Sequence, residues 1–354
     1  MTRFPSATEL LERYGLLVLF AVVFIFFSVS PKTPQFLTTA NITNILSSQV
    51  VLGIIAIATV LPLVAGHFDL SIGANAGFVT ALSAGLMAKS HLPLAAAIGI
   101  GLAVGAGIGI VNGFLVAKLE LNSIVATLGM SSIIAAGVQW YSKGETISAG
   151  VSQNWIDFGA GDWFGIPRVV FMLLAVALLA WYVLEHTPAG RYLFSVGVSD
   201  RAASLVGIPV QRLTFFSFVA AGILGAAAGL LLLAIQGGAD PAIGPTFTLP
   251  AVAAVFLGAT AIKPGRYNVW GTIAAVFFLA ISVNGLTLLG AEAWVGNLYD
   301  GLALVIAVAV AKWANKRRLR HSGAPDMDEP GGRDGSADDP GEPEGALLTP
   351  EARL

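Results

Sequence analysis

The chain has 354 residues, of which 56% are hydrophobic and only 11% are charged, and its mean hydropathy is +0.79. Soluble domains carry about a quarter charged residues, so this composition excludes a soluble protein and indicates an integral membrane protein. Cysteine is absent, so disulfides, thiolate nucleophiles and cysteine metal sites are excluded. The formal net charge of −2 says little by itself, and no nucleic-acid partner is expected.

Ten apolar runs predict an all-α polytopic bundle of about ten membrane-spanning helices, because a span needs about 20 largely apolar residues. The runs lie near residues 15–30, 44–65, 69–88, 92–116, 122–141, 168–184, 213–235, 248–263, 269–289 and 295–313. They divide the chain into a cytoplasmic N-terminal segment (1–14), a permease domain (15–313) and a C-terminal tail (314–354). Broken helices are expected near the path of the transported solute.

The distribution of basic residues predicts the orientation of these helices. An even number of spans puts both termini on one side, and cytoplasmic loops carry the excess of Lys and Arg. With the N-terminus inside, 15 of the 19 basic residues are cytoplasmic, and only Lys32, Lys89, Lys143 and Arg168 lie outside. Both termini are therefore predicted to be cytoplasmic. The loop 142–167 then faces outward and the loop 185–212 faces the cytoplasm.

The tail and the glycines carry two further predictions. The residues beyond 320 are rich in Asp, Glu, Pro and Gly, a composition typical of a disordered acidic tail. The basic cluster 312–320 before it is expected to contact anionic membrane lipid. Glycines at positions 99, 101, 105 and 109, and at 222, 225 and 229, are spaced for close contacts between helices.

Motifs for enzymatic chemistry are missing from the sequence. It contains no G-x-x-x-x-G-K-[ST] phosphate loop, no H-E-x-x-H pair and no G-x-S-x-G elbow. Its four histidines are scattered, without a carboxylate–histidine spacing suited to a metal. We therefore expect no catalytic residue, no metal site and no cofactor in this chain.

Asp69 is the foremost ionisable candidate at membrane depth, within the segment Gly66–Gly73 (GHFDLSIG) between two apolar runs. One interpretation makes it a proton or cation site, or a polar lining of the solute path. The other makes it a cap that accepts a backbone N–H near Ser71 or Ile72 at the start of a helix. The cap is favoured because one acid without a partner makes a poor proton relay. Either interpretation puts Asp69 and Ser71 near the path, because a break within the membrane must be buried in protein or line a cavity.

Uncharged polar residues within or beside the apolar runs form a second group of candidates. They could hydrogen-bond a hydroxylated substrate, although tying helices together is the commoner use of such residues. The group comprises Asn112, Asn122, Ser123, Thr127, Gln139 and Asn284. Asp300, near the outer start of the last helix, is expected to cap that helix or to reach toward the membrane surface.

The loop 185–212 bears on the energy source. Gradient-driven transporters usually need an acid or a cation cage at mid-membrane, and this chain offers one weak candidate. Either it is a passive channel or a partner supplies the energy. Ser199 and Asp200 predict the cap and first turn of a short helix, which Gly207 stops and Pro209 prevents from continuing.

The short helix predicted within this loop carries a compact apolar knob formed by Ala202, Ala203 and Leu205. Such a knob could enter a groove on another subunit. The alternative is an amphipathic segment on the membrane surface. That alternative is disfavoured because the central part of the loop has only two basic residues, Arg191 and Arg201.

The chain resembles the membrane permease subunits of bacterial ATP-binding-cassette (ABC) sugar importers of the ribose/xylose/galactose group, from about residue 16 to 317. Four blocks carry the resemblance, with Asn284-Gly285 after the last: Gly66–Gly73 (GHFDLSIG), Asn112–Met130 (NGFLVAKLELNSIVATLGM), Gly190–Val210 (GRYLFSVGVSDRAASLVGIPV) and Gly258–Thr272 (GATAIKPGRYNVWGT). His67, Lys263-Pro264 and Tyr267 depart from the usual pattern of the family. Branched-chain amino acid permeases share the general architecture, but the Gly190–Val210 block is closer to the sugar group.

This resemblance implies a multi-pass permease in the bacterial cytoplasmic membrane that forms the path for a pentose or hexose. It implies two permease copies, two cytoplasmic ATPase domains that bind ATP and Mg²⁺, and an extracytoplasmic solute-binding protein. The loop between the runs 168–184 and 213–235 would contact the ATPase, through Gly190, Arg191, Asp200, Ala202, Ala203 and Gly207. The outer loop 142–167 would help to receive the binding protein. Path candidates are Asp69, Ser71, Asn112, Thr127 and Asn284.

Three alternatives stay open at this stage. The permease could carry another small solute, such as a branched-chain amino acid, a nucleoside or a polyol. The chain could be a stand-alone passive or gradient-driven carrier that needs no ATPase. A receptor or scaffold would depend on the acidic tail.

Overall fold

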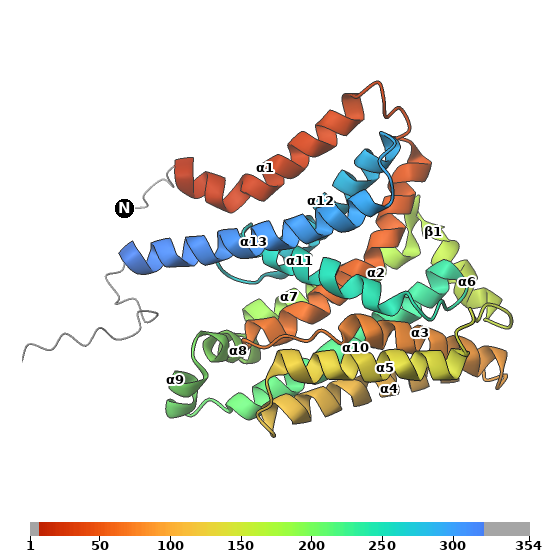
Figure 1. The fold of residues 1–354 in the computed structure, drawn as a ribbon, viewed down its shortest axis with the longest axis horizontal. Helices are drawn as coiled ribbons and strands as arrows, with labels where there is room; N and C mark the ends of the chain where they lie inside the picture. The colour runs from red at the N-terminus through yellow and green to blue at the C-terminus, as the bar shows by residue number, and fades with distance from the viewer. Residues whose placement is uncertain (1–6, 322–354) are drawn as a thin grey trace, which may run out of the picture. The chain divides into compact units, whose positions relative to one another are not determined.

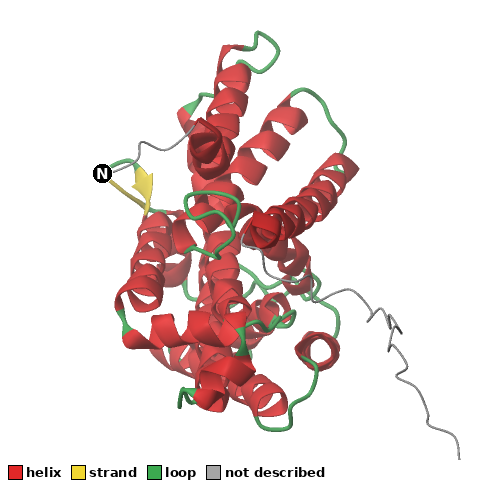
Figure 2. Cartoon of the chain, turned by 90° about the vertical axis from the view of Figure 1, so that its left-hand side faces the viewer, coloured by secondary structure: helices red, strands yellow, loops and turns green. Residues whose placement is uncertain are grey.

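The computed structural model describes residues 7–321, and its regular structure is almost entirely helical (Figures 1 and 2). Packing divides the chain into residues 1–314 and residues 315–354. The first unit holds every helix and strand among the described residues, apart from the last residues of the final helix. The segments 1–6 and 322–354 lie outside the described residues.

Six helices are long and apolar enough to cross a membrane, within the part of the chain that the structure describes. They are α2 (Thr39–Val64), α4 (Leu94–Ala117), α5 (Ser123–Ser142), α7 (Arg168–His186), α10 (Val210–Gln236) and α12 (Val269–Leu288). Each of them falls on a predicted run, so their helical character is confirmed.

The other four predicted runs also fall on apolar helices, but these are shorter. Arg13–Val29 forms most of α1 (Ala7–Val29), and Ile72–Ala88 is α3. Gly244–Gly258 joins the 3₁₀ turn η1 (Gly244–Phe247) to α11 (Thr248–Gly258), and Trp294–Ala309 belongs to α13 (Trp294–His321). The eighth run is thus the shortest continuous α-helix of the ten, because α11 ends before Lys263.

Both ends of the bundle extend beyond the predicted boundaries. Helix α1 begins at Ala7 rather than near residue 15, and α13 continues to His321, past the predicted boundary at 313. The added residues of α13 are rich in Lys and Arg, which are good helix formers and so favour continuation. Most of the predicted acidic tail, from residue 322 onward, lies outside the described residues.

The two long loops contain structure of their own. The loop 142–167 holds α6 (Gln153–Ala160) and a two-stranded antiparallel hairpin of β1 (Asp162–Trp163) and β2 (Ile166–Pro167), which the sequence did not lead us to expect. The loop 185–212 holds α8 (Pro188–Val198) and the predicted short helix, α9 (Asp200–Leu205). The Ser199 side chain accepts from the Ala202 N–H, so the predicted cap of α9 is confirmed.

Helices α2 and α10 form the centre of the bundle, and α10 packs along α4, α2 and α3. Glycines allow the closest approaches. Gly222 of α10 lies against Gly105 and Gly109 of α4, and Gly229 lies against the Ala76 backbone of α3. The predicted close helix contacts are therefore confirmed at these positions. Gly99, by contrast, has no neighbour within 4 Å of the position where a Cβ would stand.

The loops gather at two opposite ends, as Figure 1 shows with α8 and α9 at the left and β1 and α6 at the right. At the first end the Ile262 N–H donates to the Arg13 carbonyl (2.8 Å), and Lys118 Nζ donates to Gln211 Oε1 (3.2 Å). At the second end a backbone bridge joins Ile147 to Ala239. Segments predicted to be cytoplasmic thus contact one another, and the predicted outer loop lies at the far end.

Candidate functional site

A break of seven residues separates α2 from α3 and brings together most of the predicted path residues. Helix α2 ends at Val64, Gly66 takes a left-handed conformation (φ +85°), and α3 begins at Ile72. The N–H groups of residues in an irregular break are not satisfied by a helix, so they need other acceptors. Here α5 supplies two: the Phe68 N–H donates to Ser123 Oγ and the Leu70 N–H to Thr127 Oγ1, both at 3.1 Å.

Asp69 lies inside the same break and is almost fully buried. Its Oδ1 accepts from the Ser71 N–H (2.9 Å) and from the Ser71 hydroxyl (2.7 Å). The amide of Asn112, on α4, donates to the Ser71 hydroxyl (2.7 Å). Asp69 therefore closes the turn that precedes α3 by accepting from the Ser71 N–H, as the capping interpretation expects, although Ser71 itself holds the N-cap position and its side chain makes no capping hydrogen bond.

Four of the five path candidates thus belong to one buried network: Asp69, Ser71, Asn112 and Thr127. Asn284 lies apart from them on α12. It exchanges two amide hydrogen bonds with Asn41 of α2 (3.0 and 3.1 Å) and lines a cavity between α2, α11, α12 and α13. That these candidates occupy two separate places could not be predicted from the sequence.

Helices α8 and α9 form the coupling segment predicted from the loop 185–212. Thr187 caps α8 by accepting from the Gly190 N–H, and Pro188 follows at the first helical position, where its missing N–H is harmless. Helix α9 ends at Leu205, and Gly207 adopts φ +82° before α10 starts directly after Pro209. Pro209 therefore separates α9 from α10. Helix α10 begins at Val210, three residues before the predicted start at residue 213.

The predicted ATPase-contact residues face in two directions. Gly190 and Ala203 are buried within the chain, whereas Arg191, Asp200, Ala202 and Gly207 are exposed. The most exposed apolar side chains of the segment are Val198 (88%), Leu205 (83%) and Val206 (76%). Val198 and Val206 were not predicted as ATPase contacts. Branched apolar residues within a polar loop could have indicated that they contact a partner. Large exposed apolar side chains at an aqueous surface are typical of an interaction site.

The coupling segment contacts the helix break directly. Gly197, near the end of α8, lies so close to the Val64 carbonyl oxygen that a Cβ at this position would overlap it. A Cβ at Gly66 would in turn lie 3.7 Å from the Gly197 Cα. Because only glycine permits this approach, α8 rests on the exact end of α2 where the chain turns toward α3.

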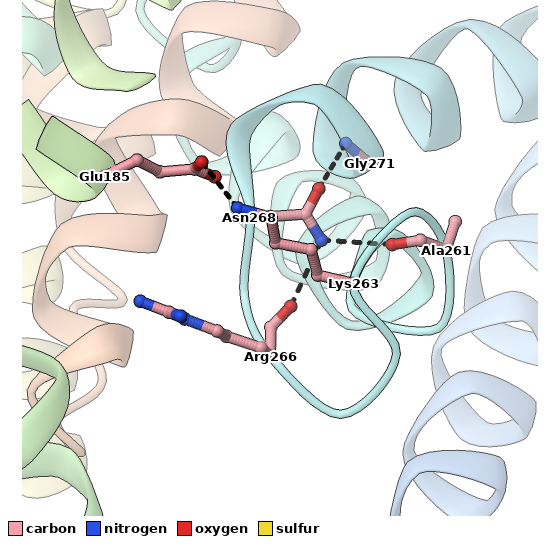
Figure 3. A network of polar contacts seen from close by, with 6 residues as sticks. All are labelled: Glu185, Ala261, Lys263, Arg266, Asn268 and Gly271. Atoms are coloured by element: carbon pink, nitrogen blue, oxygen red, sulfur yellow. Dashed lines mark hydrogen bonds and ion pairs between the residues drawn. The ribbon is translucent and has the colours of Figure 1, made fainter. Parts of the chain in front are cut away.

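A second contact joins the coupling segment to the turn between α11 and α12. Lys263 in this turn pairs with Glu185 at the end of α7 (Figure 3). The Arg266 guanidinium lies 3.6 Å from the ring centre of Phe194 on α8. Such cation–π contacts contribute about 0.5–1 kcal/mol at exposed sites. Lys263, which departs from the family pattern, and Arg266 therefore hold the turn against α7 and α8.

Asn268 fixes the shape of that turn, whose conformation the sequence left open. Its Nδ2 donates to the carbonyls of Ala261 and Arg266 (both 3.1 Å), and its Oδ1 accepts from the Gly271 N–H (2.7 Å) (Figure 3). The same Nδ2 also donates to the Gly258 carbonyl (3.2 Å). One buried amide thereby closes the turn and caps α12. The sequence analysis did not single out Asn268, although an Asn directly before an apolar run is a common cap signal.

Comparison with known proteins identifies the family. Residues 41–310 match the family described as "Branched-chain amino acid transport system / permease component". The ribose import permease protein RbsC of Escherichia coli (strain K12) is 33% identical over 316 residues, which cover 87% of this chain and 96% of that protein. RbsC of Bacillus subtilis (strain 168) is 34% identical over 79% of this chain and 87% of its own length.

A relative whose name states a different substrate is the autoinducer 2 import system permease protein LsrD of Photorhabdus temperata. It is 30% identical over 87% of this chain and 97% of its own length. No solved structure matches the chain significantly. The chain therefore belongs to this permease family of bacterial ABC importers, as a multi-pass transport component of the cytoplasmic membrane and not as an enzyme.

Proposed function

We propose that this chain forms the translocation path of an ABC importer for a small sugar, with D-ribose as the first substrate to test. The observation that carries the proposal is the coupling segment, with its exposed apolar side chains and its contact with the helix break. An energy source outside the chain needs such a surface. Relatives whose names state ribose or autoinducer 2 import match along most of the chain, which supports a sugar over other solutes.

The proposed topology has ten spans with both termini in the cytoplasm. Ten apolar helical segments support it, six of them long and four shorter, together with the distribution of Lys and Arg. The contacts among Arg13, Ile262, Lys118 and Gln211 also support it, because they group the basic segments at one end. Helices of about 17 residues lie at the short end of the range that can span a bilayer.

The proposed ATPase contact uses the exposed side of α8 and α9. Arg191, Asp200 and Ala202 would contact the partner, with Leu205 and Val206 as apolar anchors. Gly190 and Ala203 would act from beneath by letting the segment pack on the chain, and Gly207 would set the direction of the chain toward α10. ATP and Mg²⁺ would bind in the partner, and this chain would supply none of their ligands.

The remaining partners are proposed from the family. Permeases of this kind work with ATPase and solute-binding subunits, and we propose a homodimer of this chain with two ATPase domains. The outer loop 142–167, with α6 and the hairpin, would receive the binding protein. The side chains of the basic cluster 312–320 lie outside the described residues, and we propose that they contact anionic lipid.

Reconstitution of the chain with its ATPase and binding protein in liposomes tests the proposal. Uptake of labelled D-ribose should require all three components and ATP. Asp200→Arg and Gly207→Trp should reduce uptake strongly while the chain still inserts into the membrane, because one reverses a charge at the contact and the other strains a left-handed residue. Uptake by the chain alone would instead establish a stand-alone carrier, and ATP-dependent uptake of L-isoleucine but not D-ribose would establish an amino acid permease.

A further inference from the structure

The end of the bundle opposite the coupling segment contains a polar cavity that none of the proposed contacts uses. Its volume is about 360 Å³, and it opens between α2, η1 and α11, α12 and α13. Seven polar side chains from α2, η1, α12 and α13 line it: Asn44, Ser48, Gln49, Thr246, Asn284, Asn297 and Asp300. The Thr246 hydroxyl already donates to the Ile243 carbonyl. A cavity of this size falls within the range that holds small ligands, which is about 300–1,000 Å³.

Several of these side chains keep free hydrogen-bonding capacity. Asn284 is committed to Asn41 through both amide atoms, and Gln49 donates to the Ser48 hydroxyl (3.3 Å). Asn44 and Asn297 are exposed and Asp300 is half-buried, and among the described residues their side chains have no hydrogen bond or ion pair with the protein. Polar groups within an apolar bundle usually bond to other helices, so these three side chains, which line one cavity and tie no helices together, can bond to a ligand.

The chemistry of the lining suits a neutral polyhydroxylated solute. Amide groups both donate and accept, and a carboxylate accepts, so the set matches hydroxyl groups. The opposite wall is apolar, with Phe247, Pro250 and Val283, and can pack against the C–H face of a sugar ring. An amino acid fits less well. Asp300 can pair with the α-ammonium group, but the lining residues include no Lys or Arg, so the α-carboxylate would have no charged partner.

The position of the cavity suits the entry side of the path. It lies where α2 and α13 begin and α12 ends, which is the outer end in the proposed topology. Helices α11 and α12 run from this cavity to the turn that Lys263 and Arg266 join to the coupling segment. A movement of the coupling segment can therefore be transmitted to the cavity wall through α11 and α12.

We propose that this cavity is the outer solute-binding subsite of the permease, in which Asn44, Gln49, Asn297 and Asp300 hydrogen-bond the hydroxyl groups of a sugar. The paired Asn41 and Asn284 position one wall without contacting solute through free atoms. This inference rests on the proposed function, because it concerns the path of the same importer.

Single-cysteine labelling tests it in the complete complex, since the natural chain contains no cysteine. Ser48→Cys and Asn297→Cys place a thiol in the cavity, and Gln139→Cys places one on an exposed face of α5 outside it. At about 100 mM D-ribose, maleimide labelling of the two cavity cysteines should slow about tenfold if the Kd is about 10 mM. Labelling of Gln139→Cys should not change, and L-isoleucine should protect none of the three.

A second pair of variants separates binding from accessibility. Gln49→Leu should reduce D-ribose uptake by the full complex at least about tenfold, because an apolar side chain leaves a sugar hydroxyl unpaired. Gln139→Leu, the same substitution outside the cavity, should transport normally. If the wild-type complex imports D-ribose but the cavity cysteines are not protected, or are protected by L-isoleucine, the subsite is wrong while the function stands. If the wild-type complex imports no D-ribose, the proposed function itself fails.

Discussion

Lys263, in the turn between α11 and α12, forms an ion pair with Glu185 at the end of α7. The pair joins a turn and a helix end through residues that are 78 positions apart in sequence, and it lies beside the start of the coupling segment. Both side chains are partly buried, so the pair is less screened by solvent than a fully exposed one. It ties the turn that Asn268 shapes to the helix from which α8 departs.

We expect Glu185→Gln and Lys263→Met each to lower the free energy of unfolding by about 0.5–1 kcal/mol, the usual contribution of a partly exposed ion pair. The double variant should cost less than the sum of the two, because either change alone already removes the pair. Thermal unfolding of the four proteins in detergent measures this cycle. Strictly additive costs would show that the pair contributes nothing.

Gly197→Ala should disturb the contact between α8 and the break, because its Cβ would overlap the Val64 carbonyl oxygen. We expect ATP-driven uptake to fall more than expression or membrane insertion does. Gly99→Ala is the matched control, since no atom lies within 4 Å of its added Cβ. The control should be neutral or slightly stabilising, by up to about 1 kcal/mol of helix propensity. Equal uptake by the two variants would contradict a role for the contact.

The exposed apolar side chains of the coupling segment should carry part of the ATPase affinity. Leu205→Ser and Val206→Ser should each weaken binding of the ATPase by about tenfold, because burial of such a side chain contributes about 1.5–3 kcal/mol. Val125→Ser alters a comparably exposed residue of α5, outside the segment, and should leave affinity unchanged. Co-purification and titration of the ATPase in detergent measure the effect. A loss shared equally by Val125→Ser would point to general destabilisation.

Thr127→Val should destabilise the helix break, because it removes the hydroxyl that accepts from the Leu70 N–H without changing the volume. The buried N–H then lacks an acceptor, at a cost of about 1–3 kcal/mol. Thr127→Ser keeps the hydroxyl and should retain most of the stability. Unfolding temperatures of the three proteins give the comparison, and the idea fails if the serine variant unfolds as early as the valine variant.

Much of the helical framework could be predicted from sequence. Apolar runs located all ten apolar helices, and Ser199 with Gly207 located α9, because these signals act through neighbouring residues. Helix ends were less well predicted at α1 and α13. The elements α6, α8 and the hairpin were missed, because short helices and strands in loops depend on packing against the rest of the chain.

For the functional residues, their identity could be predicted from sequence but their contacts could not. Sequence identified Asp69, Ser71, Asn112 and Thr127 as polar groups at membrane depth, but not that they share one network. It predicted that Asp300 caps α13 or reaches toward the membrane surface, but not that Asp300, in the second turn of α13, lines a cavity. The Gly197 contact joins residues more than 100 positions apart, and no local pattern reports such a distance.

The sequence by itself determined the class of protein, the apolar helices and the family. Hydropathy, charge distribution and glycine spacing reflect the requirement that every backbone polar group in a bilayer be satisfied within the chain. Only the tertiary structure decided which polar side chains form hydrogen bonds within the helix break and which line the cavity without a protein partner. It also decided where α8 rests on α2 and how Lys263 reaches Glu185. These relationships arise from packing between distant segments, where the same Asn or Asp can serve as a cap, a helix tie or a ligand-binding group depending on its neighbours.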